Sequence, residues 1–432
     1  MTDIYEIAEY TLEALKKSGA EAAQCIVSKS KKDELNVDGG KFSLMRSTFN
    51  TSISMKAIKD GKKGVTSINQ ATKEAIDEAA DQCISAAQSS VPDEAEQIAP
   101  FTAKAEYKTG VFEPELDKLF DRIEEFMSQT AAEYPKVILE QLISDYEHSE
   151  KLYMNTNGTS LKYEHGEYSF NTMFSAHEGE KASSFNGYFC ALDSLDKPFM
   201  DAGMQKQLLA ESEKQLDTVS PSEKFVGRVI YSPDCFNELL QTALENFASS
   251  GVLIDGTSPW KDALNTKVAS EKLNLRSVPL DGRTVVGQRF TSDGYPVEDM
   301  DIIIDGVLKT FILSQYGANK TGFPRSLNSG NNLEVLPGDK ALEEMISGID
   351  RGLIVNRFSG GQPSSNGDFS GVAKNSFLIE NGKVVSAVSE TMISGNIIDM
   401  LNNIVAVSKE QTTDGLSFMP WAEFDGVTVS GK

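Results

Sequence analysis

Residues 331–407 decide the fold, beginning NNLEVLPGDKALEEMISGIDRGLIVNRFSGGQPSSNGDFSG and continuing through KNSFLIENGKVVSAVSETMISGNIIDMLNNIVAV. Apolar residues recur at helical spacing between Asp339, which can cap a helix, and Gly352, which can end one. Residues 353–355 then have the pattern of a strand. We therefore predict a helix followed by a strand, and the apolar positions of the helix are Leu342, Met345, Ile346 and Ile349.

The remainder of this segment predicts a hairpin and a second helix. Asn381-Gly382 separates two apolar runs, at 377–379 and 384–385, and this dipeptide is typical of a type I′ turn between paired strands. Asn396 can cap a helix whose apolar residues lie at 397, 401, 404 and 405. Helical and strand periods thus alternate along the segment.

Several motifs occur here in a fixed order: PGDKxLEExIxxIxxGLxV, GGQ…GDFSG, FLIENGK and SGNxxDMLxNIxAV, preceded at 306–322 by GVLKTFILSQYGANKTG. This order resembles the TldD/PmbA family, whose members are called modulators of DNA gyrase. The resemblance covers most of the chain and is weaker in its amino-terminal part. It leaves open which of the family's two subunit types the chain represents.

The zinc motif that the resemblance implies distinguishes the two types. The family's catalytic-type subunit carries HExxxH on a helix near the start of its last domain, and a cysteine near its carboxyl end. Imidazoles can bind the metal, and the glutamate can act as general base on metal-bound water. The similar helix here, SPDCFNELLQTALENFASS at 232–250, contains Glu238 and Glu245 but no histidine. We therefore predict no catalytic residue and no metal ligand in this chain.

The few histidines and cysteines support this prediction. The three histidines, His148, His165 and His177, all precede the last domain, whose one cysteine, Cys235, lies far from the carboxyl end. His177-Glu178 is followed by neither HExxH nor HExxxH spacing, and we interpret it as part of a surface strand. Cys235, at a helix start, is interpreted as a small buried residue. A metal site built from dispersed Asp and Glu oxygens stays open, because no spacing would reveal it.

Composition argues against several functional classes, although the net charge does not exclude a local basic groove. The 432 residues carry a net charge of −23, which argues against nucleic-acid binding because phosphate contacts need a basic surface. The four scattered cysteines have no CxxC spacing, as expected in a reducing compartment. No apolar run approaches the ~20 residues of a membrane span, and no signal-peptide pattern follows Met1. We expect a cytoplasmic protein.

We predict an α+β fold with three domains, at residues 1–105, 106–222 and 223–432. Residues 1–19 should form an amphipathic helix, 22–30 and 33–38 two strands, 52–68 a hairpin, and 91–108 a linker. In the last domain, Asx-Gly pairs at 281, 305, 381 and 425 indicate hairpins. They predict a large, mostly antiparallel sheet that could close into a barrel, with a few helices.

The glycine-rich loop at 359–371 is the candidate site. It either makes a tight connection inside the sheet or borders an internal cavity or a partner subunit, with Asp368 and Ser370 fixing it through hydrogen bonds. The candidate loop residues are Gly360, Gly361, Gln362, Asp368, Phe369, Ser370 and Gly371, and the nearby start of the second helix adds Ser394, Gly395 and Asn396.

The resemblance then implies a PmbA/TldE-type subunit that pairs with a TldD-type subunit, as a heterodimer or larger assembly. The partner would hold zinc, and the assembly would cleave peptides or unfolded polypeptides inside a cavity. This chain would supply interface and cavity wall, without a cofactor of its own. Two alternatives stay open: a self-sufficient metallopeptidase with other ligands, and a regulatory protein that binds a gyrase-associated factor. A homodimer of the isolated chain stays open as well. Whether the chain is itself an enzyme also stays open.

Overall fold

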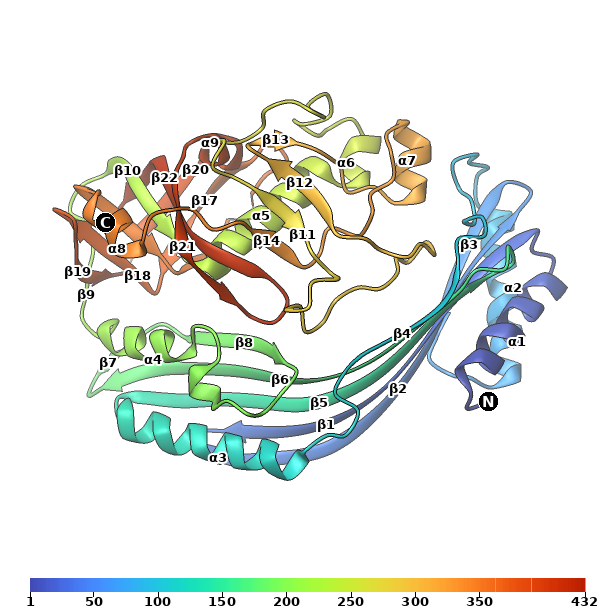
Figure 1. Ribbon diagram of the computed structural model, residues 1–432, viewed down its shortest axis with the longest axis horizontal. Coiled ribbons are helices and arrows are strands. Elements are labelled where there is room, and N and C mark those ends of the chain that lie inside the picture. The colour runs from blue at the N-terminus through green and yellow to red at the C-terminus, as the bar shows by residue number, and fades with distance from the viewer. Residues whose placement is uncertain (362, 390, 432) are drawn as a thin grey trace.

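The computed structural model describes residues 1–361, 363–389 and 391–431, and it shows an α+β protein built on two large sheets (Figure 1). The described residues form 8 strands in one sheet and 14 in the other. The predicted fold class is therefore confirmed. None of the helices in the described part of the chain is long and apolar enough to cross a membrane.

The first sheet consists of long, curved strands with helices on its outer face (Figure 1). Its strand order is β3-β2-β1-β5-β6-β4, and β7 and β8 both pair with β6. β1 and β2 are antiparallel, and β4 runs parallel to β6. The elements are α1 (Ile4–Lys17), β1 (Ala22–Asp38), β2 (Lys41–Lys59), β3 (Lys62–Ile68), α2 (Lys73–Ser89), β4 (Lys104–Gly110), α3 (Leu116–Glu133), β5 (Val137–Asn155), β6 (Ser160–Glu178), β7 (Lys181–Ala182) and β8 (Asn186–Leu192).

The two faces of this sheet differ because alternate side chains of a strand point to opposite faces. Leu35 and Val37 of β1 are buried in one apolar core with Leu119, Ile123 and Phe126 of α3. At the other end of the sheet, α1 and α2 cover Cys25, Val27, Ile53 and Met55. The opposite, inner face carries mainly polar side chains and lies toward the second sheet (Figure 1).

The elements between the two sheets are η1 (Phe199–Asp201), α4 (Gln205–Lys214) and β9 (Thr218–Val219). The second sheet follows, with most of its strands antiparallel and with β10 parallel to β15. Its elements are β10 (Phe225–Tyr231), α5 (Pro233–Ala248), α6 (Ser250–Ile254), β11 (Leu275–Ser277), β12 (Met300–Ile304), β13 (Val307–Leu308), α7 (Gln315–Thr321), β14 (Leu333–Val335), α8 (Leu342–Ser347), β15 (Arg351–Val355), β16 (Arg357–Ser359), β17 (Asp368–Lys374), β18 (Ser376–Glu380), β19 (Lys383–Val388), β20 (Thr391–Asn396), α9 (Ile397–Asn402), β21 (Ile404–Thr413) and β22 (Phe418–Ser430). We call residues 224–431 the third domain.

Several local predictions are confirmed. The amphipathic helix at the start is α1, and Asp3 caps it with a side-chain oxygen that accepts from two backbone N–H groups. Asn381 and Gly382 both have positive φ, as a type I′ turn requires, and they join β18 to β19. Asn396 caps α9.

Other local predictions are wrong. α8 is shorter than predicted, because Ala341 is its N-cap and Gly348 its C-cap, while Gly352 lies in β15. α9 ends at Asn402, and residues 404 and 405 belong to β21. Residues 22–38 form one continuous strand, because β2 and β5 pair with β1 on both sides of the predicted break.

The remaining differences also arise where pairing between distant strands overrides a local sequence pattern. Asp281-Gly282 lies in a loop, and Asp425-Gly426 lies inside β22, opposite an irregularity in its pairing with β10. The end of the predicted linker forms β4, which pairs with β6. Strands from both sides of residue 105 therefore pair in one sheet, and backbone hydrogen bonds cross the boundary predicted there.

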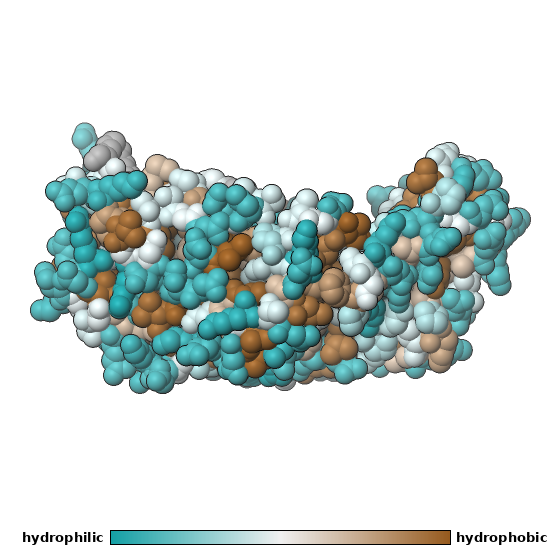
Figure 2. Space-filling view, turned by 90° about the horizontal axis from the view of Figure 1, so that it is seen from above, coloured by the Kyte–Doolittle hydropathy of each residue, from teal (hydrophilic) through white to brown (hydrophobic). Residues whose placement is uncertain are grey.

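Figure 2 shows the molecule from above, with hydrophilic side chains over most of this face and apolar ones scattered among them. The outline is indented toward the right, between the third domain and the end of the first sheet that carries α1 and α2. A predominantly hydrophilic surface agrees with the net charge of −23.

Candidate functional site

A cleft of about 940 Å³ separates the inner face of the first sheet from the third domain. Its floor is polar, with Ser28, Ser30, Asn50, Ser149 and Lys151 contributed by β1, β2 and β5. Its roof consists of α5 and of loops around residues 286–290, 329–333 and 414–417. The alternation of side chains along the strands thus produces a polar surface that faces the third domain across open space.

Helix α5 presents one polar stripe to this cleft. Asn237, Gln241 and Glu245 line the cleft, and their spacing of four residues places them on one side of the helix. The Gln241 amide donates to Asn237 Oδ1 at 3.3 Å, and the Asn237 amide donates to Ser417 Oγ at 3.3 Å. The apolar side of α5 packs into the third-domain core through Phe236, Leu240, Ala243 and Phe247.

The neighbouring side of α5 meets the glycine-rich loop that the sequence indicated. Glu238 and Thr242 line a cavity of about 200 Å³ together with Phe358, Gly360 and Phe369. Phe358 and Phe369 pack edge to face, with ring centroids 5.7 Å apart. The loop therefore lines a partly open pocket, and the structure brings it against the helix that the resemblance singled out.

The two predicted groups of site residues also lie together. β17 and β20 pair Phe369 with Gly395 and Ser370 with Ser394. Asp368 accepts hydrogen bonds from the amides of Asn396 and Asn366, both at 2.9 Å, and these bonds hold the pKa of Asp368 below its usual range. Gln362 lies outside the described residues.

Two glycines of the loop leave no room for a side chain. Gly361 has a φ of +49°, and a Cβ there would lie 1.7 Å from the Ser370 carbonyl oxygen. A Cβ at Gly371 would lie 2.3 Å from Cζ of Phe358. Gly360 differs, because its φ is positive but nothing lies within 4 Å of the added atom. Close approach of backbone and ring therefore fixes the path of the loop.

Cys235 is a buried free thiol, and burial raises its pKa well above the ordinary value. A thiol in this state is a poor nucleophile and a poor metal ligand, because both roles need the thiolate. Its interpretation as a small buried residue is consistent with this environment.

The donor groups at the cleft do not fit the zinc site that the family implies. Zinc sites in proteins use Cys, His and carboxylate ligands, whereas α5 presents two amides and one carboxylate. Across the described residues, no three His, Cys, Asp or Glu side chains are grouped closely enough to hold a metal ion. All three histidines lie in the first sheet, where each is within 4 Å of a glutamate oxygen: Glu164 for His148, Glu167 for His165 and Glu140 for His177.

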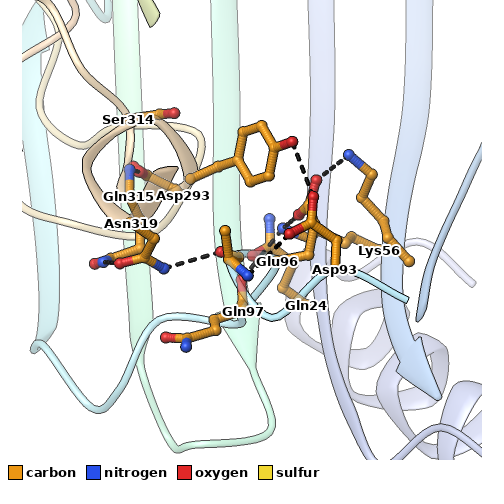
Figure 3. Close-up of polar contacts among 12 residues, drawn as sticks. Gln24, Lys56, Asp93, Glu96, Gln97, Asp293, Ser314, Gln315 and Asn319 are labelled. Atoms are coloured by element: carbon orange, nitrogen blue, oxygen red, sulfur yellow. Dashed lines mark hydrogen bonds and ion pairs between the residues drawn. The ribbon is translucent and has the colours of Figure 1, made fainter. Parts of the chain in front are cut away.

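Contacts between the first sheet and the third domain bound the cleft at both ends. At one end, the Tyr188 hydroxyl donates to the Thr413 carbonyl at 3.0 Å, and the Ala191 N–H donates to the Asp414 carbonyl at 2.8 Å. At the other end, the segment that precedes β4 contacts α7 through polar groups (Figure 3). This contact was not predicted, because Pro and acidic residues at 91–103 carry no signal that distinguishes a linker from a segment held by long-range contacts.

Two family models match the chain, and together they cover more than half of it. The PmbA/TldA metallopeptidase C-terminal domain matches residues 224–431, and PmbA/TldA metallopeptidase domain 1 matches residues 23–87. The Escherichia coli O157:H7 metalloprotease PmbA is 32% identical over 155 residues, which is 35% of this chain and 34% of that protein. A zinc metalloprotease TldD homolog from Saccharolobus solfataricus is 28% identical over 220 residues, 47% of this chain and 49% of that protein. The chain thus matches about a third to a half of the length of these relatives.

Solved structures show the same fold over almost the whole chain. TldE from Thermococcus kodakarensis has a TM-score of 0.82 at 22% identity, covering 98% of this chain and all of that one. A Bacteroides thetaiotaomicron protein named for modulation of DNA gyrase has a TM-score of 0.83 at 24% identity, and each chain is fully covered. From the domain matches, the similar proteins and the motifs in residues 331–407, this chain belongs to the TldD/PmbA family, which is of the metallopeptidase type.

Proposed function

We propose that this chain is the non-catalytic, PmbA/TldE-type subunit of a two-subunit zinc peptidase that cleaves peptides or unfolded polypeptides. It contributes interface and cavity wall, and a TldD-type partner contributes the zinc and the general base. Helix α5 carries the proposal: HExxxH spacing that starts at position 237 needs imidazoles at 237 and 242, and this chain has the amide of Asn237 and the hydroxyl of Thr242 there.

The cleft supports a role in holding a peptide. Its polar floor and the amides of α5 offer donors and acceptors that main-chain amide groups can pair with. Its volume of about 940 Å³ is at the upper end of ordinary ligand sites, which span about 300–1,000 Å³. A short extended segment of polypeptide therefore fits better than a small metabolite.

The open edge of the first sheet supports a protein partner. β3 pairs with β2 only from Ile53 to Lys59, so the described residues leave β2 without a neighbour on that side before residue 53. Met45 and Phe49 lie on this stretch and are 73% and 74% exposed. A long unpaired edge with exposed apolar side chains is typical of a surface that another chain covers.

Reconstitution tests the proposal. The chain should lack stoichiometric zinc and peptidase activity when purified alone, and it should form a zinc-containing, active complex with a TldD-type chain from the same cells. Stoichiometric metal and activity in the isolated chain would instead favour the self-sufficient metallopeptidase. Affinity purification that recovers only a non-protease target would favour the regulatory binding protein.

A further inference from the structure

The two junctions that bound the cleft differ in chemistry. At the junction beside β8 and α4, residues of the first sheet and of the third domain share one apolar core. Phe199 and Leu208 are buried there with Ile230, Ile379 and Trp421. Buried apolar contacts of this kind persist under ordinary solution conditions, because separating them exposes apolar surface to water.

The opposite junction depends on Asp93, in the segment between α2 and β4 (Figure 3). Asp93 Oδ2 accepts a hydrogen bond from the Tyr316 hydroxyl at 3.1 Å and pairs with Lys320 Nζ at 2.8 Å. The Asn319 amide donates to the Ala95 carbonyl at 2.9 Å. Side chains of α7 thus contact one short stretch of the amino-terminal half, at Asp93 and Ala95.

This stretch is also fastened to its own sheet. The buried side chain of Glu96 pairs with Lys56 Nζ of β2 at 2.7 Å and with Lys63 of β3. Asp93 therefore faces the third domain while Glu96, three residues later, faces the first sheet (Figure 3). The segment therefore connects α7 to β2 and β3.

A loop at 290–295 completes this junction. The Gln24 amide donates to the Ser292 carbonyl at 3.2 Å, and the Thr102 hydroxyl donates to the Gly294 carbonyl at 2.7 Å. Asp293 accepts from the Gln315 N–H at 2.7 Å, which ties the loop to α7. Phe290 provides the buried apolar contact, with Tyr153 and Leu161. The junction is thus mostly polar and is built around one small apolar cluster.

We propose that residues 91–103 and α7 form a latch, and that the apolar junction is the hinge about which the third domain swings to open the cleft. The side chains of Asp93 and Lys320 keep 24% and 35% of their surface exposed, and exposed ion pairs are weak and screened by salt. The ion pair and the Tyr316 bond hold the pKa of Asp93 below its usual range, so Asp93 is ionised at neutral pH. That the opening admits a peptide rests on the proposed function. That the cleft opens does not.

Cysteine labelling tests the latch without a partner and without peptidase activity. The native cysteines are all buried, so Ser149→Cys places one reactive thiol on the cleft floor. A polymer-tagged maleimide should label it slowly, and a small maleimide quickly. Adding Asp93→Asn should raise the rate for the bulky reagent several-fold, and salt should raise the rate in the parent far more than in this variant.

Matched controls keep the result interpretable. Glu94→Gln removes the same charge one residue away, at an exposed side chain, and should leave the rate unchanged. Tyr316→Phe removes one contact and keeps the Lys320 pair, so it should give an intermediate rate. Cys25, which is fully buried, should stay unlabelled in every variant, because its labelling would report unfolding. Equal rates for Asp93→Asn and Glu94→Gln, or fast labelling of the parent by the bulky reagent, would overturn the latch.

Discussion

The hinge junction and the latch junction join the same two parts of the molecule by different means. One buries Phe199, Leu208 and Trp421 in a large shared apolar core. The other aligns Asp93, Tyr316 and Lys320 at a partly exposed surface, beside one small apolar cluster. The first should govern the stability of the chain, and the second should govern the width of the cleft. Substitutions at one junction should therefore change the free energy of unfolding, and substitutions at the other should change entry to the cleft.

Trp421→Ala should have the largest effect on stability. The side chain is 6% exposed within the apolar core of the hinge junction, and truncation leaves a cavity there. Loss of a buried Trp costs about 3–5 kcal/mol of unfolding free energy. Urea unfolding followed by far-UV circular dichroism measures it. Asp93→Asn should leave the urea midpoint nearly unchanged, and an equal loss in the two variants would remove the distinction between the junctions.

Gly361→Val should damage the loop beside α5. Its Cβ would meet the Ser370 carbonyl oxygen at 1.7 Å in a backbone of φ +49°, so the loop must move. Strain of this kind costs on the order of 1–3 kcal/mol, and the clash adds to it. Thermal unfolding and pairing with the partner are the measurements. Gly360→Val is the matched control, because its backbone is strained but its Cβ has space; equal losses would show that the close approach to Ser370 is not the cause.

Glu167→Gln should change how the free energy of unfolding depends on pH, because Glu167 is a largely buried carboxyl of β6. Burial raises the pKa of Glu167 to about 7, above its ordinary value of 4.5. Stability that comes from the neutral carboxyl is present below pH 4.5 and is lost as pH rises through 7. As pH rises through this range, the free energy of unfolding of the variant should therefore increase relative to that of the native chain, by at most about 3 kcal/mol.

Thermal unfolding of the native chain and of Glu167→Gln at several pH values measures this gain. Both proteins keep His165, whose own pKa is lowered by burial and whose Nε2 lies 3.1 Å from Glu167 Oε2, so the comparison reports the carboxyl together with its contact to His165. A constant difference between the two proteins from pH 5 to 8 would contradict the prediction.

His177→Ala should have the smallest effect. The ring is 42% exposed and contacts Ser175 and Glu140 in the first sheet, away from the cleft lining. Peptidase activity of the complex with a TldD-type partner should stay within experimental error of the parent. A large loss of activity would mean that His177 takes part in a catalytic site.

Features of the fold that neighbouring residues specify could be predicted from the sequence. The alternation around Asn381-Gly382, the cap at Asn396 and the crowded glycine at 361 each follow from local chemistry, and each is found in the structure. The glycine loop could be identified as a candidate because glycines mark close approaches of the backbone.

The rest depended on contacts between distant residues. Nothing local to residues 91–103 indicates that Asp93 meets α7, more than 200 residues later. The strand β4 is short and charged, and its pairing with β6 decides its conformation. The cleft itself arises only when the polar face of the first sheet meets the stripe of Asn237, Gln241 and Glu245 on α5. Sequence periodicity shows which side of a helix or strand is polar. It does not show which part of the molecule lies opposite that side.

The proposed function is tested most directly by measuring zinc and peptide cleavage for this chain alone, for a TldD-type chain alone and for the two mixed. We expect about one zinc per pair, held by the partner, and activity that needs both chains. Asn237→Ala and Gln241→Ala should change the KM of the pair without removing its metal. Stoichiometric zinc in this chain alone, with cleavage that needs no partner, would show that the chain is not a non-catalytic subunit.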